Sequence, residues 1–581
     1  MQAALINGYV EIATCLLEKG ADANAQGRNY DSVLQAAISE DHVEMFKLLL
    51  EGDVNTQCRK YGNTLPAKLV NGHIEIAKYL SEMGADMDIE GGDYDNALQV
   101  ASVKGYVEIA KHLLEKGADV NAQGGYYGNA LQAASANGHV EIAKCLIEKG
   151  GDVNAQGGYY GNALQAASVN GHIEISNCLL ENGADVNSQD GDYGNALQAT
   201  SHEGNVEIAK LLLEKGADVN TQSGGYGNAL QAASYEGHVD IVKLLLEKGA
   251  YVNAQGGYYG NALQAGSHEG YVEIVELLLE KGADVNAQDE YHGNALQSAS
   301  HEGHVEIAKL LLEAGADVNA QGKYYGNALQ AASVSGHVEI AKLLLEAGAD
   351  VNAQGGEYGK ALQAAISEDH VEIAKLLLEK GADVNAQGGK YGNALQAASH
   401  QGHLDIAMLL LEMGADVNAQ GGEYGNALQA AISEDHVEIA KLLLKTGADL
   451  NTQGGYYGNA LQAASHEGHV DIAKLLLETG ADVNAQGGKY DNASWAALVH
   501  GHVEVVKCLL ERGADVNVQG GYYGNALQVA SREGHVELVK FLLEKGADVN
   551  AQGGYHGNAL QAASHEGHAE IAKFLLEREQ M

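Results

Sequence analysis

The chain has 581 residues, 45% of them hydrophobic, and a formal net charge of −43 at pH 7. This charge excludes neither solubility nor a basic partner, but it disfavours nucleic acid and anionic membranes, because both need clustered lysine and arginine. Apolar runs reach only a few residues, too short for a signal peptide or a membrane span. Five cysteines are too few for a disulfide framework, so we expect a reduced, cytoplasmic setting.

One phrase, Tyr-Gly-Asn-Ala-Leu-Gln-Ala-Ala-Ser, recurs every 33 residues along nearly the whole chain. Its leucine marks the period from Leu65 to Leu560. A fixed period of about 20–50 residues is the signature of a repeat array, in which each repeat contacts only its neighbours. We therefore expect residues 1–581 to form one all-α solenoid domain of about 18 repeats.

The array begins irregularly. Residues 1–27 form a partial repeat, because residues 1–4 enter midway through a first helix. Solenoids need polar caps at their ends, so we expect the chain to be part of a longer protein or a truncated gene model. Residues 28–92 form two irregular repeats: the first loses two residues near 51–53, and the second carries the single proline, Pro66.

Residues 93–488 form the regular array, and residues 126–158 represent one repeat. The side chain of Asn129 can cap the free amides of a short helix over residues 130–135. Gly138 ends this helix, because glycine adopts a positive φ without steric cost. Three repeats carry aspartate instead, a residue that tolerates the same conformation; these are Asp41, Asp369 and Asp435.

A second helix is predicted over residues 140–149. On its outer face, Lys144 should pair with Glu141 and Glu148. An extended segment then leads into the next repeat, where it forms a short hairpin loop that we call the finger. Neither helix is long enough to be stable alone, so each repeat depends on its neighbours. The residues expected to face inward are Val140, Ile142, Ala143, Leu146 and Ile147.

Residues 489–521 form a third irregular repeat, followed by the C-terminal repeats over residues 522–581. Here Ser494 and Trp495 replace the leucine and glutamine of the phrase. Loss of a core leucine costs about 2–5 kcal/mol, unless Trp495 or Leu498 refills the space. Four cysteines share a position that is leucine elsewhere and are expected to be small core residues: Cys15, Cys145, Cys178 and Cys508.

The repeats resemble the ankyrin repeat. The resemblance rests on the Gly138-His139 joint, the run Leu-Leu-Glu-Lys-Gly-Ala-Asp-Val-Asn-Ala over residues 113–122, and the 33-residue period. It implies L-shaped helix-turn-helix repeats stacked into a superhelix. The family's Thr-Pro-Leu-His is here Asn-Ala-Leu-Gln over residues 129–132, so the hydrogen-bonding role of that histidine passes, if to any residue, to Gln132. This variant resembles the arrays of fungal proteins, often found downstream of a NACHT nucleotide-binding module.

The first finger position varies from repeat to repeat, whereas the tyrosine after it, such as Tyr127, is nearly constant. The constancy predicts packing of this second tyrosine between adjacent fingers. Free exchange of tyrosine, lysine and glutamate at the first position indicates an exposed side chain. Its candidates for partner binding are Tyr126, Tyr159, Tyr258, Tyr291, Tyr324, Glu357, Lys390, Glu423, Tyr456, Lys489, Tyr522 and Tyr555.

A second variable position closes the first helix, and its candidates are His202, Tyr235, His268, His301, His400 and His466. The resemblance places both variable sets on the concave face, which ankyrin arrays use for partners. The nearly invariant outer helix argues against simple drift. We therefore predict a monomeric, non-catalytic module that binds a protein partner, expected to be basic, as the recognition region of a fungal NACHT-type receptor. A structural scaffold or spacer, or a targeting subunit for an enzyme elsewhere, are the alternatives.

Three patterns resemble chemical motifs, and each is better explained by the repeat. The segment His-Glu-Gly-His at 301–304 is one residue short of the zinc-protease motif, and its glycine breaks the helix. Residues 355–360 lack the glycine and the Ser or Thr of a phosphate loop. The joint histidines occur once per repeat, about 8–10 Å apart, too far to share a metal ion with bonds of about 2 Å. We expect no catalytic residue, metal or cofactor.

Overall fold

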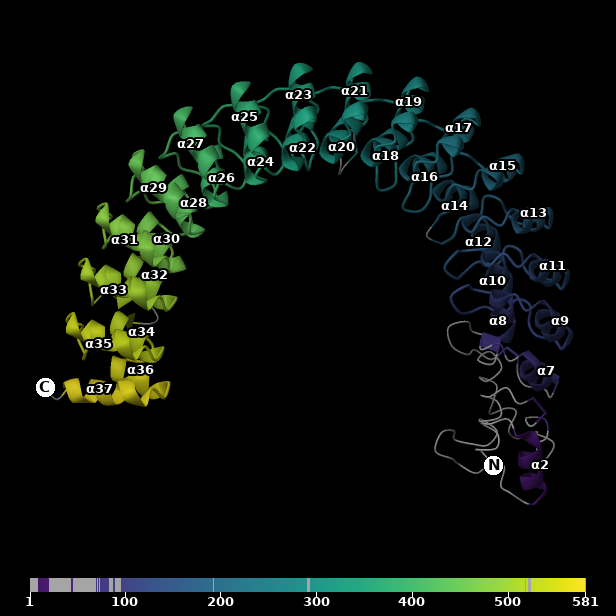
Figure 1. The fold of residues 1–581 in the computed structure, drawn as a ribbon, viewed down its shortest axis with the longest axis horizontal. Helices are drawn as coiled ribbons and strands as arrows, with labels where there is room; N and C mark the ends of the chain where they lie inside the picture. Colours follow the sequence, from purple (N-terminus) through teal and green to yellow (C-terminus); the bar gives the residue numbers. More distant parts are fainter. Residues whose placement is uncertain are drawn as a thin grey trace. The chain divides into compact units, whose positions relative to one another are not determined.

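The computed structural model describes residues 9–19, 43–44, 47, 69–70, 72, 74–82, 87–88, 96–191, 193–289, 293–517, 519–520 and 524–579. The chain divides into two compact parts, Met1–Asp289 and Glu290–Met581. Each part is built from pairs of short helices, which confirms the expected all-α repeat solenoid. In each part the first helices of the pairs form one row and the second helices form another row beside it (Figure 1).

In the N-terminal part, the first helices are α8 (Ala97–Lys104), α10 (Ala130–Ala136), α12 (Ala163–Val169), α14 (Ala196–Glu203), α16 (Ala229–Glu236) and α18 (Ala262–Glu269). The second helices are α2 (Val10–Glu18), α7 (Ile74–Glu82), α9 (Val107–Glu115), α11 (Val140–Glu148), α13 (Ile173–Glu181), α15 (Val206–Glu214), α17 (Val239–Glu247) and α19 (Val272–Glu280).

In the C-terminal part, the first helices are α20 (Ala295–Glu302), α22 (Ala328–Ser335), α24 (Ala361–Ser367), α26 (Ala394–Gln401), α28 (Ala427–Ser433), α30 (Ala460–Glu467), α32 (Ala493–Val499), α34 (Ala526–Arg532) and α36 (Ala559–His565). The second helices are α21 (Val305–Glu313), α23 (Val338–Glu346), α25 (Val371–Glu379), α27 (Leu404–Glu412), α29 (Val437–Lys445), α31 (Val470–Glu478), α33 (Val503–Glu511), α35 (Val536–Glu544) and α37 (Ala569–Glu579). A short antiparallel pair, β1 (Gln519–Gly520) and β2 (Gly524–Asn525), completes one finger.

The first helices begin at the predicted asparagine. In α14, Asn195 Oδ1 accepts a hydrogen bond from the amide of Gln198 at 2.9 Å, and Gln198 Oε1 accepts one from the amide of Asn195 at 2.8 Å. This reciprocal pair satisfies two amides that no helical carbonyl reaches. The helix ends are also confirmed, because Gly138 has a φ of 76°, and Asp369 and Asp435 have φ values of 63° and 60°. Asp41 lies outside the described residues.

The core lies between the two helix rows. In the representative repeat, Leu131, Ile142 and Leu146 are fully buried. Val140 and Ile147 are only half-buried, so the predicted inward face is too wide, because these two residues lie at the rim where the second helix meets solvent. The alanines and leucines of each repeat are covered in part by the next repeat. This arrangement is expected because the helices are too short to be stable alone.

The predicted pairing of Lys144 within its own helix is wrong. Lys144 Nζ instead lies 2.7 Å from Glu174 Oε1 of the next repeat. The prediction holds elsewhere, as in the 2.8 Å pair of Lys210 with Glu207. The flexible lysine stem reaches either carboxylate from an exposed face, where such a pair stabilises the fold by about 0–1 kcal/mol.

In the irregular repeat over residues 489–521, both residues that could fill the space of the missing leucine lie in the core, but the space is not fully filled. Trp495 and Leu498 are both buried, with 7% and 2% of their surface exposed. The indole lies directly beneath the finger, because a methyl group added to Gly520 would lie 2.1 Å from its Cε2. A cavity of about 250 Å³ remains beside Ser494. The two irregular repeats over 28–92, with Pro66, lie largely outside the described residues.

The cysteine prediction is only partly confirmed. Cys508 is buried, and Cys145 and Cys178 are half-buried. Cys15 is exposed. Across the described residues, we find no helix with the length and apolar character needed to cross a membrane.

Candidate partner-binding face

Each finger is a tight loop closed by its own backbone. In the representative repeat, the amide of Gly124 donates to the carbonyl oxygen of Gly128 at 2.7 Å, and the two residues form an antiparallel bridge. The turn requires a left-handed residue at Gly125, whose φ is 64°. The loop thereby holds Tyr126 at its tip and directs Tyr127 back towards the first helix.

Neighbouring fingers are in backbone contact. The amide of Tyr159 donates to the carbonyl oxygen of Tyr126 at 2.9 Å. A methyl group added to Gly158 would lie 2.3 Å from the carbonyl oxygen of Tyr127, so only glycine permits this approach. These contacts join the tips of these neighbouring fingers into one surface.

In most of the described repeats, a buried glutamine attaches the next finger to the repeat before it, whereas Trp495 stands at this position in the irregular repeat. Gln132 is 1% exposed, and its Nε2 donates to the carbonyl oxygens of Gly157 and Gly161, both at 2.9 Å. These carbonyls belong to the next finger, and the hydrogen bond to Gly161 is buried. Gln132 therefore takes the hydrogen-bonding role that the sequence assigned to it.

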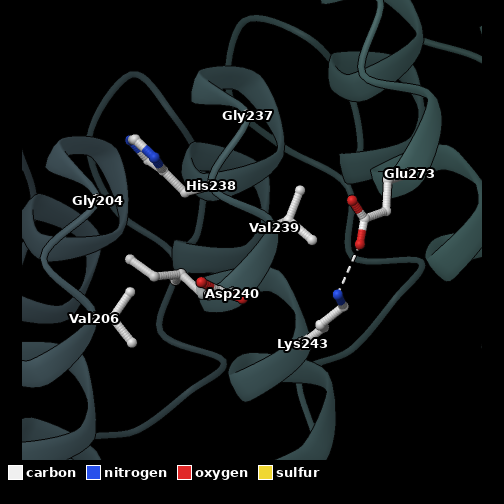
Figure 2. Close-up of a pocket in the computed structure, with 9 residues that line it drawn as sticks. Gly204, Val206, Gly237, His238, Val239, Asp240, Lys243 and Glu273 are labelled. Carbon is white, nitrogen blue, oxygen red and sulfur yellow. Dashed lines mark hydrogen bonds and ion pairs between the residues drawn. The ribbon is translucent and has the colours of Figure 1, made fainter.

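At many joints the histidine holds the end of the first helix of the preceding repeat. His238 Nε2 lies 2.8 Å from the carbonyl oxygen of His202, at the end of the previous first helix. The imidazole covers Gly204, where an added methyl group would lie 2.6 Å from its Cε1 (Figure 2). The C-terminal end of α14 is thus held against the next repeat.

The candidate side chains at the first finger position are exposed wherever the structure describes them, which confirms their predicted exposure. The exposed fractions are 52% for Tyr126, 42% for Tyr159, 72% for Tyr258, 59% for Tyr324, 46% for Tyr456 and 68% for Tyr555. Glu357, Lys390, Glu423 and Lys489 are exposed as well. Tyr291 and Tyr522 lie outside the described residues. Partner binding by these side chains stays a prediction.

A family model described as ankyrin repeats, in sets of three copies, matches residues 1–91, 67–124, 98–190, 164–256, 262–355, 321–388, 355–421, 395–487, 461–553 and 493–581. The chain belongs to the ankyrin repeat family. Ankyrin repeats typically act as non-catalytic modules that mediate protein–protein interaction. A comparison with curated proteins found no match.

The ankyrin first helices end in side chains that are less exposed than the sequence suggested. His202, Tyr235, His268, His301, His400 and His466 are all half-buried. His202 lies between Tyr193 and Tyr226, with ring centroids 5.5 Å and 4.6 Å away. His400 lies in the same way between Tyr391 and Tyr424, at 4.9 Å and 4.6 Å.

The second finger tyrosines therefore do more than contact each other. Tyr127 and Tyr160 do stack, with centroids 6.3 Å apart, as predicted. At four described repeats the aromatic residue that closes the first helix inserts between the second tyrosines of its own and the next finger; these residues are His202, Tyr235, His400 and His466. We call the exposed first finger residues together with this half-buried aromatic row the finger face.

Carboxylates accompany the aromatic row. Tyr457 Oη donates to Glu467 Oε1 at 2.8 Å, and Tyr358 Oη donates to Glu368 Oε1 at 2.7 Å. His202 Nε2 lies 3.0 Å from Glu236 Oε1. The finger face thus combines aromatic rings with negative charge, in a protein whose net charge is −43.

One repeat shows how a cation is held on this face. The ammonium of Lys489 lies 4.8 Å from the ring centroid of Tyr456 and 5.3 Å from that of Tyr490. Lys489 Nζ also donates to Tyr456 Oη. At the same position of other repeats the rings stack instead, as Tyr126 and Tyr159 do with centroids 5.1 Å apart.

Partial burial should be visible in the alkaline titration of the finger face. Burial, followed by the charges of Glu423 and Glu434, raises the pKa of Tyr424 to about 12. Its stabilising effect is complete below the unfolded pKa of about 10 and is lost as the pH rises through about 12. The phenolate absorbance difference between the wild type and Tyr424→Phe should therefore appear near pH 12. A difference appearing near pH 10 would contradict the half-buried placement.

The recess behind the joint is a poor ligand site by comparison. Its volume is about 450 Å³, and it is lined by Gly204, Val206, Gly237, His238, Val239, Asp240, Ile241, Lys243 and Glu273 (Figure 2). Lys243 and Glu273 pair across it at 2.7 Å. Its walls are polar and belong to the second-helix side, whereas small-molecule sites are mostly apolar.

Proposed function

We propose that the finger face binds a protein partner through lysine or arginine side chains of that partner. The observation that carries the proposal is the position of Lys489, whose ammonium makes cation–π contacts with Tyr456 and Tyr490. Tyr126, Tyr159 and Tyr258 are exposed, and among the described residues none of them holds a lysine in the way that Tyr456 does, so the exposed part of each ring can accept a cation from outside. Each such cation–π contact at an exposed site contributes about 0.5–1 kcal/mol.

Electrostatics favour the same class of partner. The half-buried carboxylates along the row, such as Glu236 and Glu467, lie beside rings whose faces attract cations. The net charge of −43 would also steer a basic segment towards the array. Binding along this face involves no bond making, and affinity would come from contacts repeated over several repeats.

The test is binding of a fluorescent peptide rich in lysine and arginine, followed by anisotropy at fixed salt. We expect the triple variant Tyr126→Ala, Tyr159→Ala and Tyr258→Ala to bind about tenfold more weakly than the wild type. The matched control is Tyr251→Ala, because Tyr251 is 68% exposed but lies in the segment that precedes the finger of Tyr258. Equal affinities for all three proteins would refute the proposal and favour a spacer role.

We further propose that this monomeric array is the recognition region of a fungal NACHT-type receptor in the cytoplasm. The Asn-Ala-Leu-Gln variant, seen at residues 129–132, supports this setting through its resemblance to such arrays. Sequencing the transcript upstream of Met1 tests it, and an upstream frame without a nucleotide-binding module would contradict it. Sedimentation of the purified chain tests the monomeric state.

A further inference from the structure

The last repeat differs from its relatives at one position of the aromatic row. Five repeats close the first helix with His-Glu, at His202, His268, His301, His466 and His565. In three of them the second finger residue, nine positions earlier, is tyrosine, whereas in the last repeat it is His556. Replacing a phenol by an imidazole here adds a second nitrogen donor to a histidine and a carboxylate.

The three side chains converge. One ligand atom from each of His556, His565 and Glu566 lies within 4.8 Å of the other two. His565 Nδ1 is 3.0 Å from Glu566 Oε1, and the two imidazole centroids are 4.8 Å apart. Among the described residues, this is the one group of three possible metal ligands whose atoms lie this close together.

Rigid elements hold the cluster in place. His565 is the last residue of α36 and Glu566 is its C-cap. On the finger, the amide of Gly553 donates to the carbonyl oxygen of Gly557 at 2.8 Å, and Gln528 Nε2 donates to the same oxygen at 2.7 Å. A ligand set carried on a helix end and a closed loop needs only side-chain rotation to bind.

We propose that His556, His565 and Glu566 bind one divalent transition-metal ion, with zinc as the ion that best fits these ligands. Two imidazole nitrogens and a carboxylate oxygen are a donor set that zinc accepts, with water in the fourth position. Tetrahedral ligands at about 2.1 Å from the ion lie about 3.4 Å from one another. The side chains of His565 and Glu566 are 64% and 38% exposed, so they are free to rotate inward from the 4.8 Å arrangement.

The expectation of no metal rested on the joint histidines, which occur once per repeat and lie too far apart. The proposed ligands occupy a finger and a helix end of one repeat, which the sequence alone does not show to be adjacent. The same three residue types stand at His292, His301 and Glu302. His292 lies outside the described residues, so the structure shows the three side chains together in the last repeat.

An equivalent repeat of this chain supplies the reference. There Tyr457 Oη donates to Glu467 Oε1 at 2.8 Å, and His466 Nδ1 lies 2.7 Å from the same oxygen. A phenol stays protonated near neutral pH, with an ordinary pKa of about 10. The protonated phenol of Tyr457 therefore donates its hydrogen bond to the carboxylate of Glu467 and offers no third ligand to a metal ion.

The test is calorimetric titration of the metal-free full chain with zinc chloride. Because His556→Tyr recreates the residues of the Tyr457 repeat, it should fold as the wild type does, as checked by circular dichroism. We expect this variant to bind one zinc ion fewer, or to bind that ion at least about tenfold more weakly. Unchanged stoichiometry and affinity would overturn the proposal.

The reverse variant, Tyr457→His, provides an independent arm. It places the same three residue types on α30 and its finger, and we expect one additional zinc ion to bind. Cobalt absorbance gives a second readout, because a tetrahedral site with nitrogen ligands has a visible spectrum that scattered surface histidines lack. Failure to gain a site would overturn the claim that these three residues suffice.

Discussion

Replacing Gln330 with alanine should detach the following finger and lower its local stability by about 3 kcal/mol. Gln330 is 3% exposed, and its Nε2 donates to the carbonyl oxygens of Gly355 and Gly359 at 2.9 Å and 2.8 Å. Its Oε1 accepts from the amide of Asn327 at 2.7 Å. Alanine leaves these groups without partners in a site that water enters poorly, and each such group costs about 1–3 kcal/mol.

Hydrogen exchange of the full chain, read by mass spectrometry over residues 352–362, measures this loss. The amide of Gly355, which donates to Gly359 at 2.8 Å, should exchange about a hundredfold faster. Gln354→Ala is the control, because this glutamine lies on the same finger with an exposed side chain. Equal exchange in the two variants would show that the buried glutamine does not anchor the finger.

The repeat architecture could be predicted because its signals are local. The period, the asparagine cap and the glycine at the helix end each lie within a few residues of the structure they determine. Gln132 could be identified for the same reason: it replaces a polar residue at a position where the family makes hydrogen bonds. Exposure of Tyr126 followed from the freedom of substitution at its position, without knowledge of any contact.

The arrangement of the finger face could not be predicted in full, because its contacts join residues far apart in sequence. His202 meets Tyr226, 24 residues later, with a hydrogen bond of 2.8 Å between Nε2 and Oη. Whether the end of the first helix faces solvent or the next finger depends on side-chain rotation. The constant spacing between the end of the first helix and the next finger was the sequence signal that could have indicated this contact. The pairing of Lys144 with Glu174 was missed for the same reason.

The contacts between helix ends and fingers give the variable helix-end positions a structural role. The helix-end residues vary, yet they are half-buried between two tyrosines, so their variation alters the support of the finger face as well as its chemistry. A valine such as Val334 and a histidine such as His301 give neighbouring fingers different backing. In the proposed binding mode, the exposed first finger residues therefore present a partner with a surface whose supporting side chains differ from repeat to repeat.

Replacing Gly336 with alanine should destabilise its joint by about 3 kcal/mol, from left-handed strain and displacement of a ring. Gly336 has a φ of 83°, and an added methyl group would lie 2.6 Å from His370 Cε1. His370 would have to leave its contact with the carbonyl oxygen of Val334, 2.9 Å from Nε2. Faster hydrogen exchange at the ends of α22 and α24 would report this loss.

Gly348→Ala separates strain from displacement. Gly348 has a φ of 92° and no atom within 4 Å of an added methyl group, so it should lose only the strain of about 1–2 kcal/mol. Gly336→Asp should fall between them, because Asp369 occupies the same joint position with its Oδ1 3.1 Å from His403 Nδ1. That histidine has left its carbonyl, and its Nε2 has no hydrogen-bond partner among the described residues. If the alanine variants at 336 and 348 were equally stable, the ring of His370 would contribute nothing to the joint. The aspartate repeats would then reflect tolerance of φ alone.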